Sequence, residues 1–179
     1  TTNGPGGRAG VVASLSVPVG ATRARIAYEA DAEGRLGVAV TVEPRAANGK
    51  PLPDLPRVGL QFAVAPELGA VEWYGRGPQE NYIDRKTGAP IGRYRSTVAD
   101  WITPYVRPQE NGNRTDIRWI AFRGAAGGGL MIRADGAPLM ASAWPYDMDD
   151  LAAAKHNHEL PRRDFIVVNV DHLQMGVGG

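Results

Sequence analysis

Residues 36–43, Leu-Gly-Val-Ala-Val-Thr-Val-Glu, alternate between large apolar side chains and small or polar ones. Residues 58–64, Val-Gly-Leu-Gln-Phe-Ala-Val, repeat the pattern. Because successive side chains of a β-strand point to opposite sides of a sheet, each stretch predicts a strand with one apolar face, buried against a second layer. These two stretches indicate an all-β fold.

The rest of the chain continues as short runs separated by turn signals. Glu33-Gly34, Asn48-Gly49, Gly127-Gly128-Gly129 and Asp135-Gly136 each supply a residue that tolerates positive φ. Further strands are expected at Val11–Val17, Arg25–Ala30, Ala70–Tyr74, Gly92–Arg95, Asp116–Arg123, Gly129–Arg133, Leu139–Ala143 and Phe165–Val170. Many short strands at this spacing predict an antiparallel sandwich or barrel.

One segment departs from this pattern. Between residues 147 and 157, acidic residues come first, alanines follow, and Lys155-His156 come last. This order matches helix propensity and the helix dipole, so one short helix is expected there. The chain has 179 residues, the size of one domain, and no evident linker. We therefore expect a flexible leader at 1–10 and a single unit at 11–179.

Composition argues against several classes of function. Lys and Arg number 20 against 19 Asp and Glu, a net charge of +1, without the clustered positive field that nucleic acids require. Cysteine is absent, which excludes disulfides and thiolate chemistry. No apolar run has the length of a membrane span. Neither nucleic acid nor membrane is an expected partner, and the cytoplasm is the expected compartment, with secretion left open.

Two polar clusters carry the candidate functional residues. They lie at Trp73–Arg85 and Pro104–Arg114 and are rich in aromatics, carboxylates, amides and arginines. Such side chains suit a sugar, but they equally suit a network that fixes long loops, which is the commoner use. The candidates are Arg76, Glu80, Asn81, Tyr82, Asp84, Arg85, Tyr105, Glu110, Asn111 and Arg114. Trp73 and Trp119 are expected in the core, and Trp101 and Trp144 nearer the surface.

Other chemistries have weaker signals. Glycoside hydrolysis needs two carboxylates at a defined separation, and the sequence alone does not bring any two together. His156, His158 and His172 match no zinc-binding spacing, so no metal site is expected. The serines have no nucleophile-elbow context, and Gly75-Arg76-Gly77 lacks the remainder of a nucleotide-binding loop. No cofactor is expected.

The two clusters, WYGRGPQENYIDR at 73–85 and PYVRPQENGNR at 104–114, closely resemble the C-terminal domain of family-two β-galactosidases. Leu55-Pro56-Arg57-Val58-Gly59 before them and residues 170–179, VDHLQMGVGG, after them match in order, so that the resemblance covers residues 11–179.

The resemblance implies an antiparallel β-supersandwich similar to galactose mutarotase. It also implies that the two catalytic glutamates of this retaining glycosidase lie in a separate barrel domain, so no catalytic residue is expected in this chain. A substrate-proximal loop that precedes this region in the family, and a sugar-lining tryptophan that follows the Gly-Gly motif, are not found. The domain is therefore expected to be incomplete at both ends.

Three hypotheses follow. The first is a non-catalytic module that supports the catalytic barrel and the substrate-site wall, with the remaining domains of the parent enzyme, or other copies of this chain, as partners and the galactoside as an indirect one. The second is an autonomous galactoside-binding module that uses residues of the two clusters together with Trp101. The third is a mutarotase-like epimerase, which fold analogy alone would support.

Overall fold

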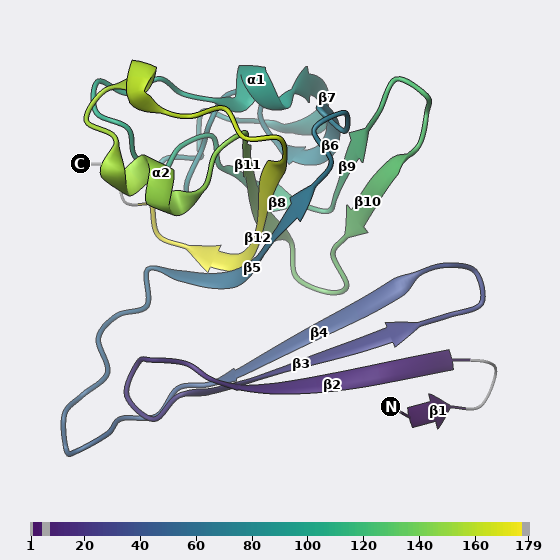
Figure 1. Cartoon of the computed structure of the whole chain (residues 1–179), viewed down its shortest axis with the longest axis vertical. Helices are drawn as coiled ribbons and strands as arrows, with labels where there is room; N and C mark the ends of the chain where they lie inside the picture. Colours follow the sequence, from purple (N-terminus) through teal and green to yellow (C-terminus); the bar gives the residue numbers. More distant parts are fainter. Residues whose placement is uncertain (1, 5–7, 177–179) are drawn as a thin grey trace. The chain divides into compact units, whose positions relative to one another are not determined.

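The computed structural model describes residues 2–4 and 8–176. Strands dominate, and they form three antiparallel sheets of four strands each (Figure 1). The expected all-β class is thus confirmed. The chain divides into two compact units, Thr1–Leu55 and Pro56–Gly179, where the sequence analysis expected a single unit. In the part of the chain that is described, no helix is long and apolar enough to cross a membrane.

The N-terminal unit is one sheet with the strand order β1-β2-β3-β4. Its strands are β1 (Thr2–Gly4), β2 (Arg8–Ser16), β3 (Arg23–Ala30) and β4 (Leu36–Glu43). Thr2 pairs with Gly10 and Gly4 with Arg8, so the leader expected at 1–10 contains a paired strand. The turn between β3 and β4 holds Gly34 at a φ of 77°, as the turn signal predicted.

Across β2, β3 and β4, one face of this sheet is apolar. The pairing of Tyr28 with Val11 and Val38, and of Ile26 with Ala13 and Val40, places these side chains on one side. On these three strands the face consists of Ala9, Val11, Ala13, Leu15, Ala24, Ile26, Tyr28, Ala30, Leu36, Val38, Val40 and Val42. We call this set the apolar face.

The apolar face is open in the unit. Leu36 is 60% exposed, Val38 42% and Val40 39%. The alternation expected at 36–43 is therefore confirmed, but the expected burial of its apolar side is wrong for the described residues. The physical reason is that this unit has a single layer, so no second sheet within it covers the face.

The second unit contains two sheets, with orders β10-β9-β6-β7 and β5-β12-β11-β8. Their strands are β5 (Arg57–Val64), β6 (Ala70–Arg76), β7 (Ile91–Thr97), β8 (Arg114–Ile117), β9 (Trp119–Arg123), β10 (Gly129–Arg133), β11 (Leu139–Trp144) and β12 (Ile166–Gln174). The expected strand at 116–123 is divided at Arg118 into β8 and β9, which belong to different sheets. Asp116, within β8, has a positive φ of 55°.

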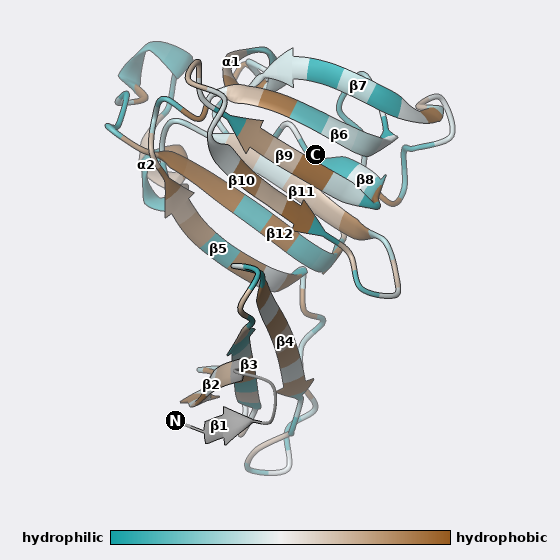
Figure 2. Ribbon diagram, turned by 90° about the vertical axis from the view of Figure 1, so that its right-hand side faces the viewer, coloured by the Kyte–Doolittle hydropathy of each residue, from teal (hydrophilic) through white to brown (hydrophobic). Residues whose placement is uncertain are grey.

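A shared core joins these two sheets into a sandwich. It contains Trp73 and Phe122 from one sheet and Val168 from the other, all with no exposed surface. Trp73 also meets Trp101 edge-to-face, with ring centroids 5.0 Å apart. Figure 2 shows hydrophobic residues along β9 and β12, two of the strands that line this core.

Two short helices lie outside the sheets. The expected one is α2 (Met148–Ala153), which begins with a capping box formed by Asp147 and Asp150; a 3-10 turn, η1 (Asn157–Glu159), follows. The other, α1 (Val98–Trp101), was not expected and is capped by Thr97. Because α1 packs its tryptophan into the core, the expected exposure of Trp101 is wrong.

The two other tryptophan expectations that failed have the same origin. Trp144 is fully buried under the loops, and its Nε1 donates to the carbonyl of Asn111 at 2.9 Å. Trp119 is only half-buried, on the outer face of β9, where the Arg93 guanidinium lies 5.4 Å from its ring. In both cases burial depends on what packs over the strand, which alternation does not specify.

Candidate functional site

The two polar clusters form two loops that share one tetrapeptide. Pro-Gln-Glu-Asn occurs at 78–81, after β6, and again at 108–111, before β8. In each loop the asparagine Nδ2 donates to the carbonyl two residues earlier, from Asn81 to Gln79 and from Asn111 to Gln109, both at 2.9 Å. We call residues 77–90, between β6 and β7, and residues 102–113, between α1 and β8, the paired loops. The repeated tetrapeptide is a signal in the sequence that relates the two loops.

The paired loops are bonded to each other in both directions. Asn81 N donates to the carbonyl of Asn113, and Asn113 Nδ2 donates to the carbonyl of Asn81, each at 2.9 Å. Asn81 Oδ1 accepts from the Thr115 backbone at 2.9 Å and from the Thr115 hydroxyl at 2.6 Å. All three side chains are buried. Each loop therefore supplies hydrogen-bond partners for buried polar groups of the other loop. Without these partners, the buried groups would lower the stability of the fold.

Both carboxylate oxygens of Glu80 accept hydrogen bonds where the paired loops meet. One carboxylate oxygen accepts from the Tyr105 hydroxyl and from Arg85, and the other accepts from the Gly112 backbone at 2.5 Å. Gly112 has a φ of 74°, and a Cβ there would lie 2.5 Å from the Trp101 carbonyl oxygen, so glycine is required. Burial and the bond to Glu80 raise the pKa of Tyr105. Glu80 thus fixes the second loop to the first.

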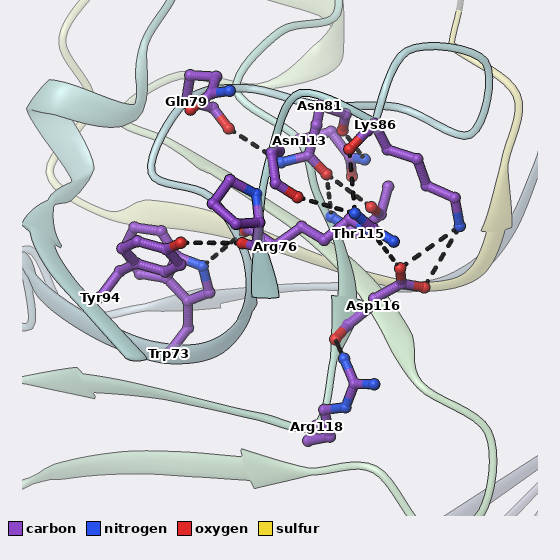
Figure 3. A network of polar contacts seen from close by, with 12 residues as sticks. Trp73, Arg76, Gln79, Asn81, Lys86, Tyr94, Asn113, Thr115, Asp116 and Arg118 are labelled. Carbon is purple, nitrogen blue, oxygen red and sulfur yellow. Dashed lines mark hydrogen bonds and ion pairs between the residues drawn. The ribbon is translucent and has the colours of Figure 1, made fainter. Parts of the chain in front are cut away.

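A second set of contacts, between Arg76, Lys86 and Asp116, joins the first loop to β8. Arg76 Nε lies 2.5 Å from Asp116 Oδ2, and Lys86 Nζ lies 3.4 Å from Asp116 Oδ1 (Figure 3). Arg76 Nη1 also donates to the carbonyls of Lys86 and Ala89 at 3.2 and 2.8 Å. Burial alone would raise the pKa of Asp116, but the bond from Arg76 and the charge of Lys86 lower it.

A buried charge cluster lies behind the second loop. Arg57 Nη1 is 3.1 Å from Glu110 Oε2, and Arg57 Nε is 3.0 Å from Asp171 Oδ2. Burial raises the pKa of Glu110 to about 7 and that of Asp171 to about 6, although Arg57 opposes both shifts. Neither oxygen of Glu110 forms a well-aligned hydrogen bond with the described residues. One guanidinium therefore serves two buried carboxyls.

The same sheet face carries further polar pairs under the loops. Gln61 Nε2 donates to Asn169 Oδ1 at 2.8 Å, and Asn169 Nδ2 donates to the Ser142 hydroxyl at 3.2 Å. Burial raises the pKa of Tyr82, whose hydroxyl has no hydrogen-bond partner among the described residues. These contacts connect β5, β12 and β11 on the side away from the core.

The structure thus brings together nine of the ten sequence-predicted site residues. Arg76, Glu80, Asn81, Tyr82, Arg85, Tyr105, Glu110, Asn111 and Arg114 lie in or beside the paired loops, where most bond to other loop residues. Asp84 is exposed and lies outside this network. Four further residues complete the pairings and were not predicted from the sequence: Arg57, Asn113, Asp116 and Asp171.

The arrangement favours rigidity over chemistry. Glu80, Asp116 and Asp171 accept hydrogen bonds from neighbouring side chains, and Glu110 is buried beside Arg57. Within residues 2–4 and 8–176, no group of three His, Asp or Glu side chains is placed to hold a metal ion. The bonded groups of this network favour one loop conformation, whereas the Tyr82 hydroxyl and the Glu110 carboxylate lack hydrogen-bond partners among the described residues.

Comparison with known proteins gives a consistent result. The family model for the β-galactosidase small chain matches residues 3–179. A β-galactosidase of Priestia megaterium is 41% identical over 139 residues, which are 77% of this chain and 13% of that enzyme. A β-galactosidase of Halalkalibacterium halodurans is 38% identical over 155 residues, which are 87% of this chain and 15% of that enzyme.

The chain spans only a small part of these relatives, 13–15% of their length. Both are named as β-galactosidases, so the matched region is a portion of a larger glycosidase in each of them. On the family match over almost its whole length, this chain belongs to the β-galactosidase small-chain family.

Proposed function

We propose that this chain is a non-catalytic β-sheet module of a β-galactosidase, which supports the catalytic domain and one wall of its substrate site. The observation that carries the proposal is the reciprocal bonding of the paired loops. Asn81 and Asn113 are buried, Glu80 is half-buried, and each of these side chains bonds to the other loop or to the start of β8. Such loops present a rigid surface rather than a set of free acids and bases.

The apolar face indicates how the module is held. Its twelve side chains alternate with mostly small or polar residues on the other side of the same strands, which is the pattern of half a sandwich core. An exposed face of this kind marks an interaction surface. We infer that in the parent enzyme a further sheet of the same polypeptide covers it, because most of the length of the relatives lies outside this chain. In the isolated chain, other copies take its place.

An amide NMR titration of the isolated chain with lactose tests the proposal, with the sugar signals observed in the same tube. The expected result is a folded spectrum that millimolar lactose does not change. Shifts confined to the paired loops, with intact sugar, would instead establish an autonomous galactoside-binding module. Cleaved or epimerised lactose would overturn the non-catalytic assignment.

A further inference from the structure

Arg114 is a buried cation that forms no ion pair with the described residues. It is 3% exposed, its Nε donates to the Pro78 carbonyl at 3.0 Å, and its Nη1 donates to the Gly112 carbonyl at 2.8 Å. The guanidinium lies 4.7 Å from the Trp101 ring and 5.6 Å from the Trp73 ring. With the described residues it forms no ion pair, and its Nη2 makes no hydrogen bond. Buried charges are rarely left in this state.

Arg114 lines a recess of about 400 Å³. The other lining residues are Trp73, Pro78, Gln79, Glu80, Arg95, Ser96, Asp100, Trp101 and Thr103. The recess is therefore large enough for a side chain of an approaching polypeptide, and the Ser96 and Thr103 residues on its wall carry hydroxyl groups.

The remaining charges around the recess are already engaged. Glu80 pairs with Arg85 at 3.2 Å, and Arg95 pairs with Glu72 at 3.4 Å. Asp100 is exposed to solvent and accepts from the Thr97 hydroxyl at 2.8 Å. Among the lining residues the structure describes, Arg114 is thus the cation without an ion pair, although the charge of Glu80 acts on it from beyond ion-pair distance.

We propose that the recess receives one carboxylate side chain, an Asp or Glu, from the part of the parent polypeptide outside this chain, and that this carboxylate bonds to Arg114. A single carboxylate fits better than a phosphate, because Glu80 and Asp100 on the wall repel a multiply charged anion. The proposal rests on the module function, since it requires a longer enzyme that docks here. Besides the contact proposed for the apolar face, the module would then have a polar contact that fixes its orientation on the rest of the parent enzyme.

Side-chain NMR of the ¹⁵N-labelled chain tests this proposal. The Arg Nε–Hε signals and the Trp101 indole signal are followed while the peptide acetyl-Ala-Glu-Ala-amide is added, to about 50 mM because an isolated carboxylate contact binds weakly. The neutral peptide acetyl-Ala-Gln-Ala-amide is the matched control. We expect a saturable shift of Arg114 that is roughly fivefold larger with the acidic peptide.

Two variants keep the test decisive. Ser96→Asp adds a negative charge to the recess wall at a half-buried position, so it should abolish the saturable shift while the chain stays folded. Arg95→Gln, on the exposed rim, should leave the shift in place. Equal, unsaturated shifts with both peptides would overturn the carboxylate site but leave the module function standing, whereas sugar binding or turnover in the lactose experiment would contradict the module function itself.

Discussion

Asn81 shows how much of the loop structure depends on one side chain. Its Oδ1 satisfies two groups of Thr115, and its Nδ2 satisfies the carbonyl of Gln79. The side chain has no exposed surface, so water cannot replace these bonds when it is removed. The cost of removal is therefore the cost of leaving buried donors and an acceptor unsatisfied.

Asn81→Ala should lower the free energy of unfolding by about 2–4 kcal/mol, because one buried unsatisfied group costs about 1–3 kcal/mol and several are created. Urea denaturation followed by tryptophan fluorescence measures the change. Gln79→Ala is the matched control, since the Gln79 side chain is exposed and makes one bond, to the Gly88 carbonyl. Equal effects of the two substitutions would show that Asn81 does not have this role.

The buried pair Glu110 and Asp171 predicts an unusual pH dependence. Burial raises both pKa values, to about 7 and about 6, above the ordinary values of 4.5 and 3.8. At a pH between the ordinary and the raised pKa of each group, the folded state binds more protons than the unfolded state. Over this range the free energy of unfolding therefore increases as the pH falls. Asp116 and Asp150, whose pKa values are lowered, oppose this trend only in more acidic solution.

The free energy of unfolding should therefore increase by about 3 kcal/mol between pH 8 and pH 5.5, on the basis of about 1.4 kcal/mol per pKa unit. Urea denaturation at a series of pH values measures the slope. In Glu110→Gln, which keeps the shape but cannot titrate, most of the slope should disappear. A stability that is flat, or that falls, over this range would mean that Glu110 is charged in the folded chain.

Among the elements, the first loop depends on the Arg76 anchor. Arg76 holds Asp116 on one side and the carbonyls of Lys86 and Ala89 on the other, so it ties both ends of the loop to β8. Substitution of Arg76 should increase local opening of the first loop more than it lowers the stability of the sandwich. Local opening of this kind is visible in amide hydrogen exchange.

In Arg76→Ala, the amides of residues 77–90 should exchange at least about tenfold faster, whereas those of β11 and β12 should change little. Hydrogen exchange read by mass spectrometry of peptides makes the comparison. Arg93→Ala is the control, because Arg93 is exposed and, among the residues the structure describes, pairs with Glu72 and the Trp119 ring alone. Uniform acceleration across the chain would mean that Arg76 stabilises the whole fold rather than the loop.

The elements also show what the sequence could and could not reveal. Strand β10 lies at the expected residues 129–133, and the turns at Asn48-Gly49 and Gly136 have the positive φ that was expected, because these signals are local. Helix α1 was missed because four residues carry too little periodicity, and its position depends on the Thr97 cap and on core packing. The alternation of β4 predicted a strand correctly, but it could not tell which part of the protein covers it.

The candidate site was predictable in composition but not in geometry. The two clusters identified Glu80, Arg114 and their neighbours, and those residues do meet. Their partners are distant in sequence, as in the bond between Asn113 and Asn81, which spans 32 residues. A single sequence does not specify such pairings, although the repeated Pro-Gln-Glu-Asn tetrapeptide indicated that the two loops are related.

For the molecule as a whole, we expect the apolar face to determine whether the isolated chain self-associates in solution. Its large side chains are spread over three strands, and Val11 and Leu15 of β2 are 52% and 49% exposed. β4 is also an edge strand of its sheet, so its outer backbone groups have no strand to pair with in this unit. Both features favour association through the N-terminal unit.

Sedimentation velocity should detect concentration-dependent dimers or larger species of the isolated chain. The double substitution Val38→Lys with Val40→Lys places charges on the apolar face and should shift the population to monomer. The matched control, Ala39→Lys with Thr41→Lys, places the same charges on the opposite side of β4 and should leave association in place. A native chain that sediments as one stable monomer would contradict the role assigned to this face.

The reciprocal bonds between Asn81 and Asn113 have a consequence for protein engineering. Because each loop supplies the partners that complete the other, neither is a modular part that can be transplanted onto another scaffold alone. An insertion in one of them would displace the bonding groups of both, so natural variation in their lengths should be linked. A designer who wishes to move this surface would have to graft the two segments together, along with the strand ends that hold them at their spacing.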